Sequence, residues 1–96
     1  MNYMDIPSFL TALPIAHRGL HDHDLPENSL AAFRAAIAHG YAIETDVRFS
    51  KDKKLVVFHD DSVDRMTDAS GSVSAFTAAD LTTLRLGGTS EHIPLF

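Results

Sequence analysis

The sequence YAIETDVRF, residues 41–49, decides the fold because apolar and polar side chains alternate along it. Successive side chains of a β-strand point to opposite faces, so Ile43 and Val47 share one face. Glu44 and Asp46 share the other face, about 7 Å apart at a rise of about 3.3 Å per residue. The alternation predicts one strand over this stretch, with a polar face that carries two carboxylates.

Two shorter apolar runs lie on either side of this strand. LPIA, residues 13–16, and LVVF, residues 55–58, predict buried strands, and each is followed directly by a histidine, His17 and His59. The KDKK turn before the second run leaves no room for a helix. If the strands that it joins are parallel neighbours, the chain must cross the sheet and return within the twelve residues between Asp46 and His59.

One helix is predicted after residue 29. Leu30, Phe33 and Ile37 recur at helical spacing, and alanines, which are strong helix formers, fill most positions between them. Asn-Ser at residues 28–29 is a good N-cap pair, and His-Gly at residues 39–40 supplies a stop. We therefore expect a helix between these two signals.

A second helix is predicted to open at Thr77, whose side chain caps it, with Asp80 three residues later. Leu81 and Leu84 are expected to pack inward. The two glycines at residues 87–88 are expected to end this helix.

The composition is that of one small globular domain, with 96 residues, 45% apolar and 22% charged. Thirteen acidic and eight basic side chains give a formal charge of −5, which argues against nucleic acid as a partner. An acidic chain is better suited to a divalent cation that recruits a phosphate. The absence of cysteine excludes disulfides and thiolate metal sites.

The first thirteen residues, MNYMDIPSFLTAL, carry no basic region and no apolar run long enough for a signal peptide or a transmembrane segment. We therefore expect a cytoplasmic protein. Proline and serine at residues 7–8 suggest the start of a short helix.

Glu44 and Asp46 are the candidate metal ligands. Two unpaired carboxylates on an interior face would be costly, so they require either a cation or pairing with Arg or Lys. Oxygen ligands without cysteine favour Mg²⁺ or Ca²⁺. The alternatives are a solvated outer face or an ion pair with Arg18 or Arg48.

His17 and His59 are the candidate catalytic pair. In an α/β barrel the reacting groups gather at the carboxyl ends of the strands, where both histidines are expected. One imidazole can take a proton while the other gives one, although a structural role is the alternative. Arg18 can offer a planar fork to a phosphate oxygen, and its alternative is a surface cation.

An ordered set of motifs runs through most of the chain: HRG from residue 17, PENSLAAF from residue 26, IETDVRFSKD from residue 43 and LVVFHDDSVDRMTD from residue 55. This order resembles the opening third of a glycerophosphodiester phosphodiesterase. The resemblance implies an α/β fold, the N-terminal portion of a (β/α)8 TIM barrel that is incomplete in this chain. Residues 1–96 would then be a single partial domain.

The resemblance also implies residue roles. His17 and His59 would be the catalytic acid/base pair, Arg18 would bind the substrate phosphate, and Glu44 and Asp46 would be metal ligands. The implied reaction is the hydrolysis of a small-molecule glycerophosphodiester to glycerol 3-phosphate and an alcohol, with Mg or Ca as cofactor.

The sequence departs from the family pattern at Arg65, where Arg-Met-Thr stands in place of Arg-Thr-Thr, so we expect a structural role in the loop. The resemblance implies a further glutamate and lysine on a strand beyond Phe96, so these 96 residues alone are expected to bind metal weakly and to turn over slowly or not at all. One alternative is a noncatalytic fragment that self-associates through open sheet edges and through the apolar residues 93–96, which are expected to be exposed. Another is a phospholipase of the same barrel type.

Overall fold

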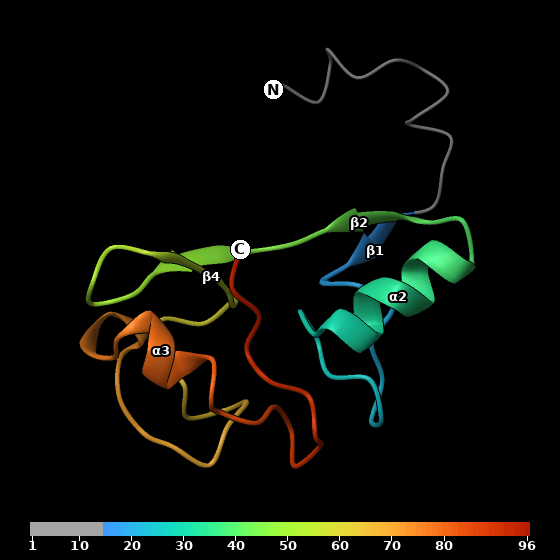
Figure 1. The fold of residues 1–96 in the computed structure, drawn as a ribbon. Helices are drawn as coiled ribbons and strands as arrows, with labels where there is room; N and C mark the ends of the chain where they lie inside the picture. The colour runs from blue at the N-terminus through green and yellow to red at the C-terminus, as the bar shows by residue number, and fades with distance from the viewer. Residues whose placement is uncertain (1–14) are drawn as a thin grey trace.

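The computed structural model describes residues 15–96. Its elements are β1 (Ile15–His17), α2 (Leu30–Ala38), β2 (Ala42–Glu44), β3 (Val47–Phe49), β4 (Leu55–Val57), the 3-10 helix η2 (Val73–Ala75) and α3 (Ala78–Leu81). Figure 1 shows α2 beside the pair β1 and β2, and α3 beside the hairpin of β3 and β4. The chain is a mixed α/β protein. The helix suggested near residues 7–8 lies outside the described residues.

The first half of the structure is a strand, helix, strand unit. β1 and β2 pair in parallel, with His17 opposite Glu44, and α2 connects them. Ser29 caps α2 by accepting a hydrogen bond from the backbone of Ala32, and His39 ends the helix, as expected. A parallel pair requires a crossover connection of this kind.

Alanines form the face of α2 that packs inward. Ala32 and Ala36 are fully buried, whereas Leu30 and Ile37 are 50% and 66% exposed. Small alanine side chains allow the helix to lie close to the strands, and Gly19 approaches Ala32 from the loop after β1. Leu30 and Ile37 are thus left on the outer side of α2, whereas Phe33 is only partly exposed.

The single strand predicted over residues 41–49 is wrong. The chain forms β2, breaks at Thr45 and Asp46, and then forms β3. β2 pairs in parallel with β1, whereas β3 pairs antiparallel with β4. The short link from Ser50 to Lys54 explains the second pairing, since parallel strands need a connection of about a dozen residues or more. The strands before and after the KDKK turn therefore form a hairpin and are not parallel neighbours.

The main hydrophobic core lies under this hairpin. Val56, Leu81, Leu86 and Ile93 are among its fully buried side chains. Thr77 caps α3 as predicted, but the helix ends at Leu81, well before the glycines at residues 87–88.

The last residues return to β4 and are only partly exposed. Ile93 is 1% exposed and Pro94 is buried, and the Pro94 carbonyl accepts a hydrogen bond from the backbone of Val57. Leu95 and Phe96 are exposed. The expectation that residues 93–96 are all exposed is therefore wrong for the first two. Within residues 15–96 we find no helix with the length and apolar character needed to cross a membrane.

Candidate functional site

His17 and Glu44 face each other across the parallel pair of strands. They are register partners at the carboxyl ends of β1 and β2, and His17 Nε2 lies 3.2 Å from Glu44 Oε2. The sequence predicted His17 at the end of a strand and Glu44 on the polar face of a strand over residues 41–49, but it did not predict that the two side chains would contact each other. The imidazole is the more exposed partner.

Arg18 follows β1 in a left-handed backbone conformation, with φ of 59°. Its amide donates to the Glu44 carbonyl, and its carbonyl accepts from the amide of Asn28, both at 2.8 Å. These two hydrogen bonds fix the backbone on both sides of the side chain. A non-glycine residue at positive φ carries strain, which the surrounding structure must offset.

The guanidinium of Arg18 joins three segments of the chain. Nη2 lies 2.9 Å from His59 Nε2, and Nη1 lies 3.4 Å from Glu27 Oε2. Nε is 3.6 Å from Asp46 Oδ2, close enough for an ion pair but too long for a hydrogen bond. Nε is also buried, and no described residue accepts a hydrogen bond from it. Arg18 is thus a partly satisfied cation at the centre of the site.

Asp46 lies at the break between β2 and β3, where Asn28 holds it. Asn28 Nδ2 donates to Asp46 Oδ2 at 3.3 Å, and Thr45 Oγ1 donates to Asn28 Oδ1 at 3.0 Å. Asn28 is 2% exposed and has a φ of 56°, a conformation that asparagine tolerates better than most residues. Asn28 was predicted to form the helix cap together with Ser29, but Ser29 alone caps α2 and Asn28 joins the site.

His59 follows β4 and is held at both its ring and its backbone. Its Nδ1 lies 2.7 Å from Asp60 Oδ1. Its carbonyl accepts hydrogen bonds from Nε and Nη2 of Arg48, at 3.0 and 2.6 Å. The ring thus meets Arg18 on one nitrogen and Asp60 on the other.

Arg65 links the two loops that flank the site, a structural role of the kind expected from the sequence. Its guanidinium makes two hydrogen bonds to Glu27, both at 2.9 Å, and two to Asp60, at 2.8 and 3.1 Å. Hydrogen bonds from Arg65 lower the pKa of Asp60 to about 2, against a smaller opposing effect of burial. Burial raises the pKa of Glu27, but the hydrogen bonds and charges of Arg65 and Arg18 outweigh it and leave that pKa below its ordinary value. The sequence showed these residue types but no signal that they would meet.

Of the two predicted metal ligands, Glu44 has an oxygen available for a hard cation, whereas Asp46 is already held by other side chains. Glu44 Oε1 is buried and receives no hydrogen bond from any described residue, which suits a ligand oxygen. Asp46 is instead held by Arg18 and Asn28, one of the alternatives left open by the sequence. Across residues 15–96, no three histidine or acidic side chains converge as a metal site. Glu44 and Asp46 thus offer carboxylate oxygens but not a complete ligand set.

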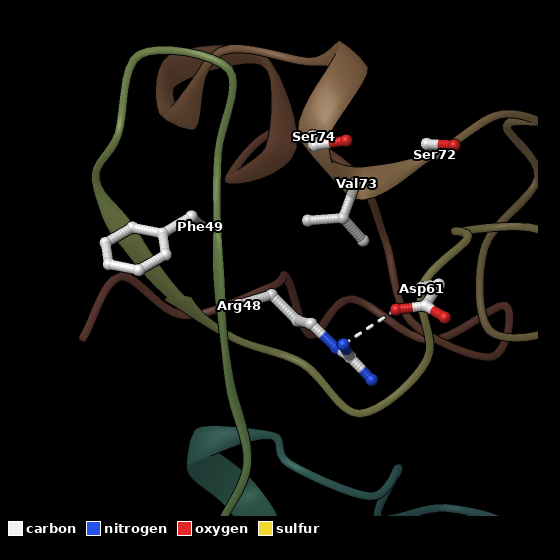
Figure 2. Close-up of a pocket in the computed structure, with 6 residues that line it drawn as sticks. All are labelled: Arg48, Phe49, Asp61, Ser72, Val73 and Ser74. Carbon is white, nitrogen blue, oxygen red and sulfur yellow. Dashed lines mark ion pairs between the residues drawn. The ribbon is translucent and has the colours of Figure 1, made fainter.

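A separate cavity of about 400 Å³ lies beside the hairpin. Figure 2 shows the Arg48 side chain reaching from β3 toward Asp61, and Arg48 Nη1 lies 2.7 Å from Asp61 Oδ1. None of the predicted site residues lines this cavity, whose lining residues are Arg48, Phe49, Asp61, Ser72, Val73 and Ser74. Arg48 connects this cavity to the site through the His59 carbonyl.

Comparison with known proteins gives a consistent set of relatives. A model of the Glycerophosphoryl diester phosphodiesterase family matches residues 17–95. The chain is 44% identical over 79 residues to the glycerophosphodiester phosphodiesterase of Caldanaerobacter subterraneus subsp. tengcongensis, a match that covers 81% of this chain and 32% of that protein.

Solved structures agree with these sequence matches. A glycerophosphodiester phosphodiesterase from Agrobacterium tumefaciens superposes with a TM-score of 0.81 at 34% identity, over 88% of this chain and 39% of that one. An Oleispira antarctica phosphodiesterase, solved with the product sn-glycerol-3-phosphate, gives a TM-score of 0.79 at 37% identity, over 90% of this chain and 38% of that one. The chain spans about a third of the length of the curated relatives that it matches.

The match to the family model begins at His17, the first residue of the HRG motif, and continues through both histidines and both carboxylates of the site to residue 95. The chain belongs to the glycerophosphoryl diester phosphodiesterase family.

Proposed function

We propose that this chain forms the N-terminal part of a (β/α)8 barrel that hydrolyses glycerophosphodiesters to glycerol 3-phosphate and an alcohol. Family membership supports the reaction class, and the relative solved with sn-glycerol-3-phosphate supports the product. Residues 1–96 would make up one partial domain of that barrel.

The arrangement around Arg18 is the observation that carries the proposal. The Arg18 guanidinium, whose buried Nε donates no hydrogen bond to any described residue, lies beside the imidazole of His59. A phosphate oxygen is a better acceptor for arginine than a neutral imidazole nitrogen, because the hydrogen bond is assisted by charge. Phosphate binding to Arg18 would therefore draw Nη2 away from His59 Nε2 and leave that nitrogen able to exchange a proton.

His17 and His59 would then divide the proton transfers. The ring that accepts a proton acts as general base toward the attacking hydroxyl, and the other protonates the departing alkoxide. His17 is close to Glu44, whose carboxylate can stabilise the protonated imidazole. Arg18 would bind the negative charge that develops on the phosphoryl oxygens.

Glu44 and Asp46 would supply two ligands to a divalent cation, Mg²⁺ or Ca²⁺. The unpaired Glu44 Oε1 supports this role. When bound, such a cation polarises a phosphoryl oxygen as a Lewis acid. The carboxylates would also hold His17 and Arg18 in place through the contacts described above.

The test is a hybrid enzyme. The matching 79 residues of the Caldanaerobacter relative are replaced by those of this chain, and the hybrid is assayed for release of glycerol 3-phosphate from glycerophosphocholine. We expect turnover that EDTA abolishes. His17→Ala and His59→Ala should each lower kcat by a factor of about 100 to 10,000.

His39→Ala is the matched control, since His39 is an exposed histidine at the end of α2 and its substitution should leave kcat unchanged. A hybrid that folds, as judged by circular dichroism, but releases no glycerol 3-phosphate would contradict the proposed function. Equal losses in His39→Ala and His59→Ala would contradict the assigned roles.

A second candidate, self-association of the isolated chain, is favoured by the apolar surface around the hairpin. Val47, Phe49, Leu95 and Phe96 are all large, apolar and more than 40% exposed. Exposed apolar side chains beside a short edge strand are typical of association surfaces. Sedimentation equilibrium tests this candidate, and we expect a mass above that of one chain. Replacing both Phe49 and Phe96 with serine should reduce this mass. A native chain that stays monomeric at every concentration would exclude self-association.

A further inference from the structure

The two neighbours of the His59 ring determine where its proton lies. Arginine can only donate hydrogen bonds, so the nitrogen 2.9 Å from Arg18 Nη2, which is Nε2, must accept. An ionised carboxylate can only accept, so the nitrogen 2.7 Å from Asp60 Oδ1, which is Nδ1, must carry the hydrogen. His59 is therefore a neutral imidazole protonated at Nδ1, with its lone pair on Nε2.

Asp60 can hold the ring in this way only if its own carboxylate is fixed. Arg65 Nε lies 2.8 Å from Asp60 Oδ2, and Arg65 Nη2 lies 3.1 Å from Oδ1. Both carboxylate oxygens are thus tied to one planar guanidinium, which leaves Oδ1 aimed at the ring. This bidentate geometry is specific to arginine.

Glu27 fixes Arg65 in turn. Two hydrogen bonds of 2.9 Å join the Arg65 guanidinium to both oxygens of Glu27, which is only 9% exposed. Glu27 is 38 residues away in the sequence and sits at the entrance to α2. A continuous series of hydrogen bonds therefore runs from the start of α2 through Arg65 and Asp60 to the imidazole.

We propose that Arg65 is a positioning residue that, through Asp60, fixes His59 in the tautomer with Nδ1 protonated and Nε2 free to react. The catalytic role of this tautomer rests on the proposed function, in which Nε2 exchanges a proton with the substrate. The assignment of the tautomer does not depend on the proposed function. Arg65 touches no reacting atom, so its effect reaches the chemistry only through the orientation and protonation of another side chain.

A purely structural role for Arg65 would give a different result. If Arg65 only tied two loops together, its loss would lower stability without changing the tautomer of His59. The required readout is therefore the protonation of each ring nitrogen, which the ¹⁵N chemical shifts of the imidazole report directly. These shifts can be recorded on the 96-residue chain without any enzyme assay.

The experiment compares the native chain with three variants by ¹⁵N NMR at alkaline pH, where the ring is neutral. We expect Nδ1 of His59 to be protonated in the native chain. Asp60→Ala should increase the fraction of the Nε2-protonated form, which free histidine prefers, because only the hydrogen bond from Arg18 then favours protonation at Nδ1. Arg65→Gln should act in the same direction. Arg34→Gln removes an exposed arginine of α2 and should leave the tautomer unchanged.

An Arg65→Gln chain that keeps Nδ1 protonated while losing stability would overturn the proposal and leave Arg65 as a structural link. If Arg65→Gln does not fold, the spectrum of the native chain still tests the proposal, because a native His59 ring protonated at Nε2 would also overturn the proposal. Failure of the proposed function is distinguishable, since an inactive hybrid enzyme can coexist with an Nδ1-protonated His59.

Discussion

Replacing Asp60 with asparagine should remove an acid-sensitive contribution to stability. The Asp60 carboxylate accepts hydrogen bonds from Arg65 and His59, and its pKa falls from the ordinary 3.8 to about 2, mainly through the hydrogen bonds from Arg65. Asparagine keeps the shape of the side chain but carries no charge at any pH. The variant therefore removes the charge together with one of the two acceptor oxygens.

The size of the effect follows from the pKa. A fall from 3.8 to about 2 corresponds to about 2.5 kcal/mol of stability if it is fully expressed. Because half of the Arg65 side chain is exposed, screening by solvent should reduce this to about 1–1.5 kcal/mol. The folded state holds the carboxylate ionised more strongly than the unfolded state does. The contribution is therefore complete above pH 3.8 and is lost as the pH falls toward about 2.

Urea unfolding followed by circular dichroism at a series of pH values measures this contribution. We expect Asp60→Asn to be less stable than the native chain by about 1–1.5 kcal/mol near neutral pH. The two curves should converge as the pH falls to about 2. Asp68→Asn, which removes an exposed carboxyl from the same loop, is the control and should follow the native curve. A constant difference between Asp60→Asn and native at every pH would refute the reasoning.

Three further substitutions test the fold by urea unfolding at neutral pH. Gly19→Ala should cost about 2 kcal/mol or more, since Gly19 has a φ of 80° and an added Cβ would lie 2.9 Å from backbone and side-chain atoms of Ala32; a cost under about 0.5 kcal/mol would contradict this close packing. Ser29→Ala should cost about 1 kcal/mol through loss of the α2 cap, whereas Ser70→Ala, at an exposed loop position, should cost almost nothing. Leu81→Ala should cost about 3 kcal/mol because Leu81 is fully buried, and an unchanged urea midpoint would show that α3 does not pack on the core as described.

The elements that the sequence predicted well are those specified by nearby residues. α2 begins after Ser29 and ends at His39 because the cap and the stop signal lie next to the helix in the chain. Thr77 caps α3 for the same reason. Capping depends on hydrogen bonds over three or four residues, so a short stretch of sequence is enough to locate it.

The break between β2 and β3 could not be predicted in this way. From residue 43 to residue 49 the odd positions are Ile, Thr, Val and Phe and the even positions are all charged, so the pattern favours one strand. The break arises because the two halves pair with different partners, β1 and β4, and because Asn28 binds Thr45 and Asp46 between them. Pairing partners and the Asn28 contacts lie far away in the sequence.

The site shows the same division between local and distant signals. The position of His17 and His59 after apolar strands predicted them as a catalytic pair, and Arg18, directly after His17, was predicted to bind a phosphate oxygen. The ion pairs of Arg65 with Glu27 and Asp60 join positions up to 38 residues apart, and no spacing rule connects them. The catalytic and metal-binding roles of the predicted residues remain proposals that the experiments above test.

Titration of the isotope-labelled chain with sn-glycerol 3-phosphate, followed by NMR, tests the central claim most directly. We predict that the resonances of Arg18 Nε and of the His59 ring shift with added ligand, even if binding is weak, and that Arg18→Lys greatly reduces the shifts. The cavity at Arg48, Ser72 and Ser74 offers the competing location for an anion beside an arginine. If only resonances of residues that line that cavity shift, or if no resonance shifts at the highest ligand concentration, the phosphate site at Arg18 is contradicted.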